Sequence, residues 1–232
     1  MLIGFSTVSL SKTHKRVSAE TFEFFRLLGC NAIEVMCAGD EDLEKLVGEI
    51  VPNDLRDFEY MALHAPAIYE AKTLKLLKKA QDIFGFKTIV IHPDEVENWE
   101  MLKRFSLPFA IENMDWRREI GKYTESMEDI FKKHDMPMVL DLNHCFTNDP
   151  SMKLAEEMRE KFAEKIKEIH LSGFEQEHEP LFKTKQKEIL NAIYDENLPI
   201  VIESECETVE DAGKEFEYVR SFLAESGKMG NN

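Results

Sequence analysis

The stretch 137–145 joins a buried strand to chemically active side chains. Its first residues, Pro-Met-Val-Leu, are apolar, and the stretch then presents Asp141, Asn143 and His144. A carboxylate and an imidazole three residues apart are ligand types that divalent metals prefer. The stretch therefore predicts part of a metal site, provided that other strands end in the same way.

Other predicted strands do end in such residues. Five of the seven histidines, two glutamates and Asp141 fall at or just after predicted strand ends: His64, His92, Glu112, Asp141, His144, His170, His178 and Glu203. A single histidine on a strand usually serves packing, but converging buried carboxylates and imidazoles must be paired or bound to a metal, because uncompensated burial costs too much free energy. The mixed ligand types favour Zn²⁺, Mn²⁺, Co²⁺ or Fe²⁺ over Ca²⁺. His14 and His134 are interpreted as surface residues.

The spacing of apolar runs predicts the strands that position these residues. Strands are predicted to start near residues 2, 32, 60, 88, 108, 137, 166 and 199, and the sixth is predicted to extend over 137–145. Helical periodicity follows each of them, over 21–28, from 40 onward, and over 71–84, 98–105, 126–134, 151–162, 184–194 and 209–223.

Eight alternating strands and helices with short connections close into a parallel barrel. We therefore expect an α/β protein, a single (β/α)8 TIM barrel over residues 1–232, with a frayed tail at 225–232. Chemistry in such a barrel lies at the C-terminal ends of the strands, where the candidate ligands fall. An open doubly wound sheet is the alternative, but it requires a Gly-rich phosphate-binding turn after an early strand, which the sequence lacks.

Composition limits the class of partner and the compartment. The chain carries 29 Lys and Arg against 45 Asp and Glu, a net charge of −16. An acidic surface repels phosphate backbones, so nucleic acid is a disfavoured partner. The four cysteines form no C-x-x-C pair and are interpreted as free thiols. No apolar run is long enough to span a membrane and the N-terminus has no basic leader, so a cytoplasmic location is expected.

The segment after strand five offers candidates for substrate binding. Trp116, Arg117 and Arg118 fall on the face where chemistry is expected. Arginine there could hold a phosphate or carboxylate group, and a solvated loop is an equally good interpretation. Cys145 and Cys206 could be soft metal ligands, but buried free thiols are the favoured interpretation.

Together these residues resemble the xylose isomerase-like barrel superfamily, which contains sugar isomerases, sugar epimerases and abasic-site nucleases of the endonuclease IV type. The resemblance covers nearly the whole chain. It rests on an ordered set of short motifs: Leu63-His-Ala-Pro66, Ile91-His-Pro93, Ala110-Ile-Glu-Asn113, Leu140-Asp-Leu-Asn-His144, Ile169-His-Leu-Ser172, His178-Glu-Pro-Leu181 and Ile202-Glu203.

The isomerase and epimerase branch implies a single-metal site. By resemblance, the metal would be bound by Glu112, Asp141, His170 and Glu203. The two glutamates would also exchange a proton at the carbon next to the substrate's carbonyl. The residues left to contact substrate would be His64, His92, His144, Trp116 and Arg117.

The nuclease branch implies three zinc ions. The first ion would bind to His64, His92 and Glu112. The second would bind to Glu112, Asp141, His170 and Glu203. The third would bind to His144 and His178. The third ion also requires an aspartate where this sequence has Gln176, and a neutral amide replaces a carboxylate poorly. Short loops and the net charge of −16 also disfavour a polyanionic substrate.

The sequence therefore predicts a metal-dependent isomerase or epimerase of a sugar or sugar phosphate, with one to three divalent ions. One alternative is a zinc phosphodiesterase related to the abasic-site nucleases, and the other is a noncatalytic barrel that binds a metal or sugar. Phe182-Lys-Thr184 replaces the Gly-x-Gly that often follows His-x-Pro-Leu in the superfamily, which leaves the substrate class open. The oligomeric state is open as well.

Overall fold

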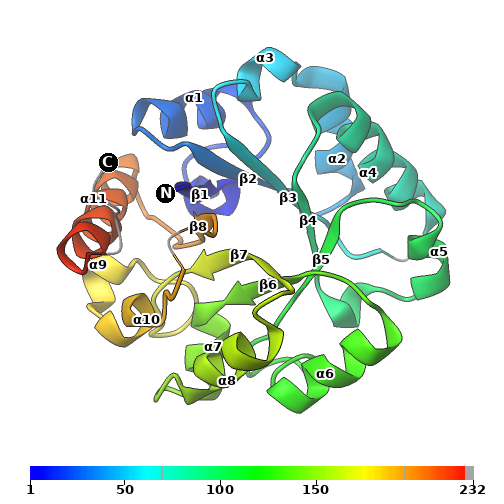
Figure 1. The fold of residues 1–232 in the computed structure, drawn as a ribbon. Helices are drawn as coiled ribbons and strands as arrows, with labels where there is room; N and C mark the ends of the chain where they lie inside the picture. The colour runs from blue at the N-terminus through cyan, green and yellow to red at the C-terminus, as the bar shows by residue number, and fades with distance from the viewer. Residues whose placement is uncertain (69, 196, 228–232) are drawn as a thin grey trace.

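Eight parallel strands form a closed barrel in the computed structural model, which describes residues 1–68, 70–195 and 197–227. The strands are β1 (Ile3–Ser6), β2 (Ala32–Met36), β3 (Tyr60–His64), β4 (Thr88–Ile91), β5 (Phe109–Glu112), β6 (Met138–Asp141), β7 (Ile166–Leu171) and β8 (Ile200–Ile202). Each strand pairs with its neighbours in sequence, and β8 pairs with β1 to close the ring (Figure 1). Every strand begins within one residue of its predicted start, and the predicted TIM barrel is confirmed.

Helices surround the strands (Figure 1). They are α1 (Ala19–Leu27), α2 (Asp40–Glu49), α3 (Pro52–Leu55), α4 (Ala71–Phe84), α5 (Trp99–Lys103), α6 (Thr124–Lys133), α7 (Leu142–Asn148), α8 (Lys153–Phe162), α9 (Leu181–Thr184), α10 (Lys187–Asn191) and α11 (Val209–Glu225), with 3-10 turns at Thr7–Leu10 and Pro93–Glu95. Of the predicted tail 225–232, residues 228–232 lie outside the described part of the chain.

The predicted sixth strand, 137–145, is wrong beyond Asp141. β6 ends there, and α7 begins at once with Leu142. The Asp141 carboxylate accepts a hydrogen bond from the backbone N of His144 at 2.7 Å and thereby caps the helix. A helix start, and not an extended strand, therefore sets the relative position of Asp141 and His144.

The connection between β7 and β8 also differs from its prediction. The periodicity predicts one helix over 184–194, but the chain forms two short helices, α9 and α10. Lys185 between them has a left-handed backbone conformation, with φ of 60°. Its backbone N donates to Leu181 O at 2.8 Å and ends α9, so a continuous helix cannot form.

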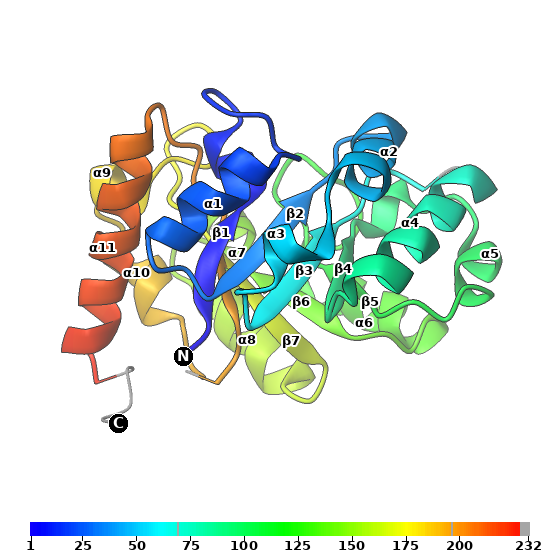
Figure 2. The same cartoon turned by 90° about the horizontal axis from the view of Figure 1, so that it is seen from above.

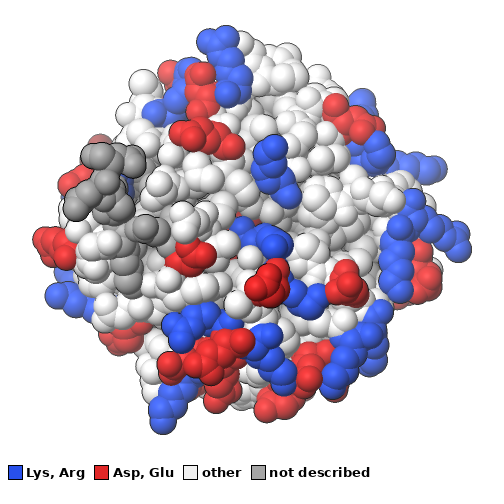
Figure 3. All heavy atoms as spheres, viewed as in Figure 1, with Lys and Arg blue, Asp and Glu red and all other residues white. Residues whose placement is uncertain are grey.

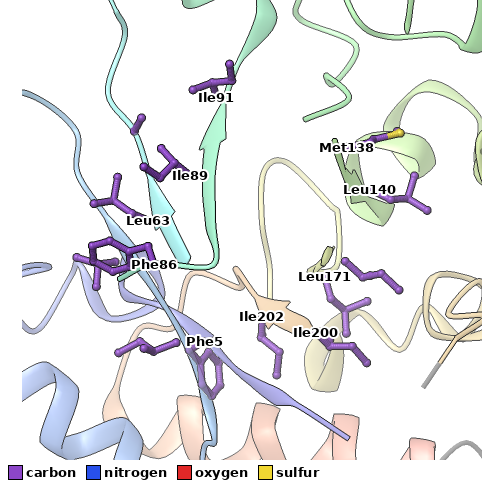
Figure 4. Close-up of a cluster of buried hydrophobic side chains, with 14 of the residues drawn as sticks. Phe5, Leu63, Phe86, Ile89, Ile91, Met138, Leu140, Leu171, Ile200 and Ile202 are labelled. Atoms are coloured by element: carbon purple, nitrogen blue, oxygen red, sulfur yellow. The ribbon is translucent and has the colours of Figure 1, made fainter. Parts of the chain in front are cut away.

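Strand side chains alternate between the helices and the barrel interior. Outward-facing residues such as Phe5 and Leu171 form the main apolar core under the helices (Figure 4). Inward-facing apolar residues such as Ala62 and Val90 are small and form two separate clusters. Polar side chains fill the rest of the interior, and they form the site described below.

The outer layer is completed by the last helix. α11 packs against α9 and α10 (Figure 2), and its Phe216 lies with its ring 5.9 Å from that of Phe5 in β1. On the face shown in Figure 3, basic and acidic side chains are interspersed. None of the helices in the described residues is both long and apolar enough to cross a membrane.

Candidate metal centre

Six of the predicted metal ligands meet at the end of the barrel where the strands terminate. They come in order from β3 to β8: His64, His92, Glu112, Asp141, His170 and Glu203. Five of them are buried, with at most 8% of their surface exposed, and His92 is half-buried. Successive parallel strands end at one edge, so residues far apart in sequence come into contact. Their roles as ligands stay predictions.

The first group consists of three carboxylates and one imidazole: Glu112, Asp141, His170 and Glu203. One candidate ligand atom from each lies within 4.8 Å of all the others. His170 Nδ1 is 3.1 Å from Glu112 Oε1 and 3.3 Å from Glu203 Oε2. This mixture of donors suits Zn²⁺ and the neighbouring transition metals.

A second group shares Glu112 with the first. His64 Nε2 lies 3.3 Å and His92 Nε2 lies 3.1 Å from Glu112 Oε2. Glu112 thus presents Oε1 to His170 and Oε2 to the two other histidines. A carboxylate in this position could bridge two ions.

Both groups have dimensions that suit a bound ion. Four tetrahedral ligands at 2.0–2.1 Å from an ion lie about 3.3 Å from one another. Four nitrogen–oxygen separations, those of Glu112 from His64, His92 and His170 and that of His170 from Glu203, are 3.1–3.3 Å, and Asp141 lies within 4.8 Å of its group. Asp141 Oδ2 is buried and forms no hydrogen bond, which is costly for a carboxylate unless a cation binds there. The residues present therefore fit a divalent metal.

The imidazoles and carboxylates of the centre shift one another's pKa. Burial opposes the charge on His92, but the carboxylates of Glu112 and Glu95 outweigh burial and raise the pKa of His92 to about 10. Burial alone would raise the pKa of Glu112 and of Glu203, but the charge of His170 outweighs burial. It holds the pKa of Glu203 at about 2 and that of Glu112 well below its usual value. Burial shifts Asp141 the other way and raises the pKa of its carboxyl. Glu112 and Glu203 are thus the carboxylates whose charge favours a divalent cation.

His144 and His178 lie beside the centre but belong to neither group. Their rings are 5.6 Å apart. His144 Nδ1 donates to the backbone O of Asn113 at 2.8 Å, and His178 Nδ1 lies 2.9 Å from Ser172 Oγ. Each histidine lines the cavity above the centre. Their predicted roles, as metal ligands or as substrate contacts for His144, remain predictions.

The two other predicted substrate contacts differ in position. Arg117 lines the cavity, but its guanidinium pairs with Asp115 at 2.5 Å and Glu177 at 3.4 Å. Arg118 also lines it and pairs with two further carboxylates. Trp116 is 54% exposed and lies outside the described residues that line the cavity. Both arginines at the mouth are thus already engaged by carboxylates.

Three polar residues near the centre were missed at the level of the sequence. Asn113 bonds to the backbone of Asp141, and Glu34 of β2 and Glu168 of β7 are fully buried beside His170. A signal for Glu168 was present, because it stands two positions before His170 and strand alternation directs both side chains to the same face. Glu34 stands in the middle of an otherwise apolar strand.

Comparison with known proteins places the fold. No model of a known protein family matches the sequence. No curated protein matches it either. Among solved structures, endonuclease IV from Thermus thermophilus superposes with a TM-score of 0.69 and 16% identity, over 97% of this chain and 100% of that one. A xylose isomerase domain containing protein from Salmonella typhimurium gives a TM-score of 0.64 and 10% identity, over 96% and 97%.

The chain has the xylose isomerase-like TIM-barrel fold. The 3-keto-D-glucoside 4-epimerase from E. coli has it too, with a TM-score of 0.62 and 13% identity, over 95% of this chain and 99% of that one. The fold expected from the ordered motifs is therefore confirmed. An endonuclease and an epimerase thus share this barrel, so the chemistry must be argued from the site.

Proposed function

We propose that the chain is a metal-dependent sugar isomerase or epimerase in which Glu112 and Glu203 transfer a proton at the carbon next to the substrate's carbonyl. The observation that carries the proposal is that both glutamates face one cavity, from β5 and β8, with His170 Nδ1 between them. Two carboxylates on one cavity can act in turn as general base and general acid. The epimerase with the same fold supports this reaction class.

The metal would be held by the group that contains Asp141 and His170 together with the two glutamates. When bound, it would polarise the substrate's carbonyl oxygen and stabilise the negative charge that develops there. The pKa of Glu203, about 2, keeps its carboxylate ionised at neutral pH, which is the form that can act as a base. His64 and His92 line the same cavity and would orient substrate hydroxyl groups.

The cavity supports a small substrate without a phosphate group. Its volume is about 230 Å³, below the roughly 300–1,000 Å³ typical of pockets for larger ligands. Arg117 and Arg118 line it, but the guanidinium group of each pairs with two carboxylates. Neither guanidinium is therefore available to bind a phosphate. We therefore propose a sugar rather than a sugar phosphate.

Solvent-proton exchange tests the proposed reaction. The protein, loaded with Zn²⁺, Mn²⁺ or Co²⁺, is incubated with a panel of aldoses and ketoses in D₂O, and deuterium next to the carbonyl is followed by NMR. The expected result is exchange into at least one sugar, lost in Glu203→Gln. Glu205→Gln is the matched control, because Glu205 also lines the cavity but pairs with Lys12 at its edge, and it should retain exchange. Wild-type exchange in Glu203→Gln would overturn the acid–base role.

A second candidate is a two-metal phosphodiesterase, and one observation favours it. The group of His64, His92 and Glu112 gives the centre a second set of ligands bridged to the first. Two ions bridged by a carboxylate are typical of enzymes that displace a phosphate ester. Hydrolysis of a chromogenic phosphodiester, lost in His92→Gln, together with no exchange into any sugar, would select this candidate.

A further inference from the structure

Three fully buried side chains lie deeper in the barrel, beneath the candidate metal centre. Glu34 comes from β2, and Glu168 and His170 come from β7, all with 0% of their surface exposed. One candidate ligand atom from each lies within 4.8 Å of the other two. His170 therefore faces two sites, with Nδ1 toward the metal centre and Nε2 toward the two interior glutamates.

The polar atoms that face this interior site have no hydrogen-bond partner. Both carboxylate oxygens of Glu34, Oε1 of Glu168 and Nε2 of His170 are buried and unsatisfied. The other oxygen of Glu168 accepts a hydrogen bond from Tyr60 Oη at 2.8 Å, which holds the unsatisfied one toward His170. Within the described part of the chain, neither glutamate forms an ion pair with a lysine or an arginine. A protonated His170 can offset the charge of only one of these two carboxylates, so the other must be neutralised by a cation or a proton.

The distances suit ligands of a shared cation. His170 Nε2 lies 3.3 Å from Glu34 Oε2 and 3.4 Å from Glu168 Oε1. These separations are longer than the usual 2.7–3.2 Å of an N–H···O hydrogen bond. They match the separation of about 3.3 Å between ligands of a tetrahedral ion. Similar spacing, 3.1–3.3 Å, occurs in the metal centre above.

We infer that Glu34, Glu168 and His170 form a separate, buried divalent-cation site beneath the metal centre. Two carboxylates and one imidazole nitrogen are a donor set for Zn²⁺ or a similar ion. His170 would contact the upper ion through Nδ1 and the lower ion through Nε2. The proton on the ring would be released to solvent when both nitrogens bind ions. The inference concerns metal binding and does not depend on which reaction the centre catalyses.

Complete burial of the ligands has a consequence for exchange. The glutamates of the interior site are covered on all sides, whereas Glu203 and His92 of the upper centre line the open cavity. An ion at the interior site is therefore expected to bind as the barrel folds and to leave only when the barrel opens. A chelator should remove the upper ions from the native protein and leave the interior ion in place.

The test combines metal analysis with anomalous diffraction. The full chain is produced in medium with added zinc, dialysed in its native state against EDTA, and analysed for zinc per chain. The expected result is one retained zinc per chain and, in crystals of the zinc-loaded protein, an anomalous peak enclosed by Glu34, Glu168 and His170. The absence of that peak in crystals whose upper centre contains zinc would overturn the inference and would leave the proposed reaction untouched.

Two variants separate the interior site from general effects on folding. Glu34→Gln keeps the shape of the side chain and should abolish the retained zinc and the interior peak. Glu215→Gln is the matched control, because it makes the same change at another fully buried glutamate, in α11 and outside the barrel interior, and it should keep both. Retention of the ion in Glu34→Gln would overturn the inference. So would the finding that Glu34 and Glu168 share a proton and hold no ion. If Glu34→Gln does not fold, Glu168→Gln and the wild-type map decide the question.

Discussion

Asn113 and Asp141 are joined by two reciprocal hydrogen bonds across adjacent strand ends. Asn113 Oδ1 accepts from the backbone N of Asp141 at 2.8 Å, and Asn113 Nδ2 donates to the backbone O of Asp141 at 3.0 Å. The amide side chain of Asn113 thus extends the pairing of β5 and β6 past the last backbone pair of the two strands, Glu112 and Val139. It fixes the residue whose carboxylate both caps α7 and faces the centre.

Removal of this amide should weaken metal binding. In Asn113→Leu both hydrogen bonds are lost at similar volume, so the backbone of Asp141 is no longer fixed and zinc affinity should fall about 10- to 100-fold. Competition with a chromophoric chelator measures the affinity. Asn31→Leu is the matched control, because Asn31 bonds in the same way to the backbone of Ile3 and Met1 near the opposite end of the barrel. It should lose stability but bind zinc normally; equal affinity losses in both variants would contradict the role assigned to Asn113.

Chelation of the upper ions should lower the melting temperature. The carboxylates of Glu112, Asp141 and Glu203 repel one another when no ion offsets their charge. An ion present at 1,000 times its Kd stabilises the folded state by about 4 kcal/mol. In a chain of this size that corresponds to about 8–16 °C. Calorimetry with EDTA, and with zinc-saturated EDTA as the control, measures the difference. An unchanged melting temperature would argue against metal binding at the centre.

Gly4 occupies a position that excludes any side chain. A Cβ at Gly4 would lie 1.6 Å from the backbone O of Ala32, its partner in the pairing of β1 and β2. Gly4→Ala should therefore destabilise the barrel by at least about 4 kcal/mol or prevent folding. Gly48→Ala is the control, because Gly48 lies in α2 with no atom near the added methyl group, and it should stabilise the protein by about 0.5–1 kcal/mol. Urea unfolding compares the two, and a mild effect of Gly4→Ala would show that the strands can separate at this point.

Glu215 joins α11 to the segments that follow β7 and β8. Its carboxylate is fully buried and accepts hydrogen bonds from the backbone N of Leu181 and Phe182, at 2.8 and 2.9 Å, and from Ser204 Oγ at 2.6 Å. Glu215→Ala leaves these donors unsatisfied and should cost about 3 kcal/mol of unfolding free energy. Glu217→Ala, on the exposed side of the same helix, should change it by less than about 0.5 kcal/mol. Similar losses in the two variants would mean that the helix itself, and not the buried carboxylate, is responsible.

Strand positions could be predicted from the sequence because both faces of each strand are covered. Runs such as Ile200–Ile202 are wholly apolar between polar segments, so their starts are clear. The end of β6 was not clear, because Leu142 and Cys145 extend the apolar run although they belong to a helix. The pattern of hydrophobicity does not reveal that the Asp141 carboxylate caps this helix.

The ligand groups could be predicted in part, for a similar reason. Residues at strand ends share one edge of a barrel, so the convergence of Glu112 and His170 follows from topology. The burial of Glu168 follows in the same way, because it shares a strand face with His170. The position of Glu34 does not, because β2 ends in no candidate ligand that would show which of its two faces is turned to the barrel interior.

The two oxygens of Asp141 serve different structures. Oδ1 holds the first turn of α7 through the amide of His144, and Oδ2 is directed to the metal centre. An ion that binds Oδ2 would fix the same carboxylate that caps the helix. We therefore expect a bound ion to order the first turn of α7, and the rate of hydrogen exchange at the His144 amide should fall when the ion binds.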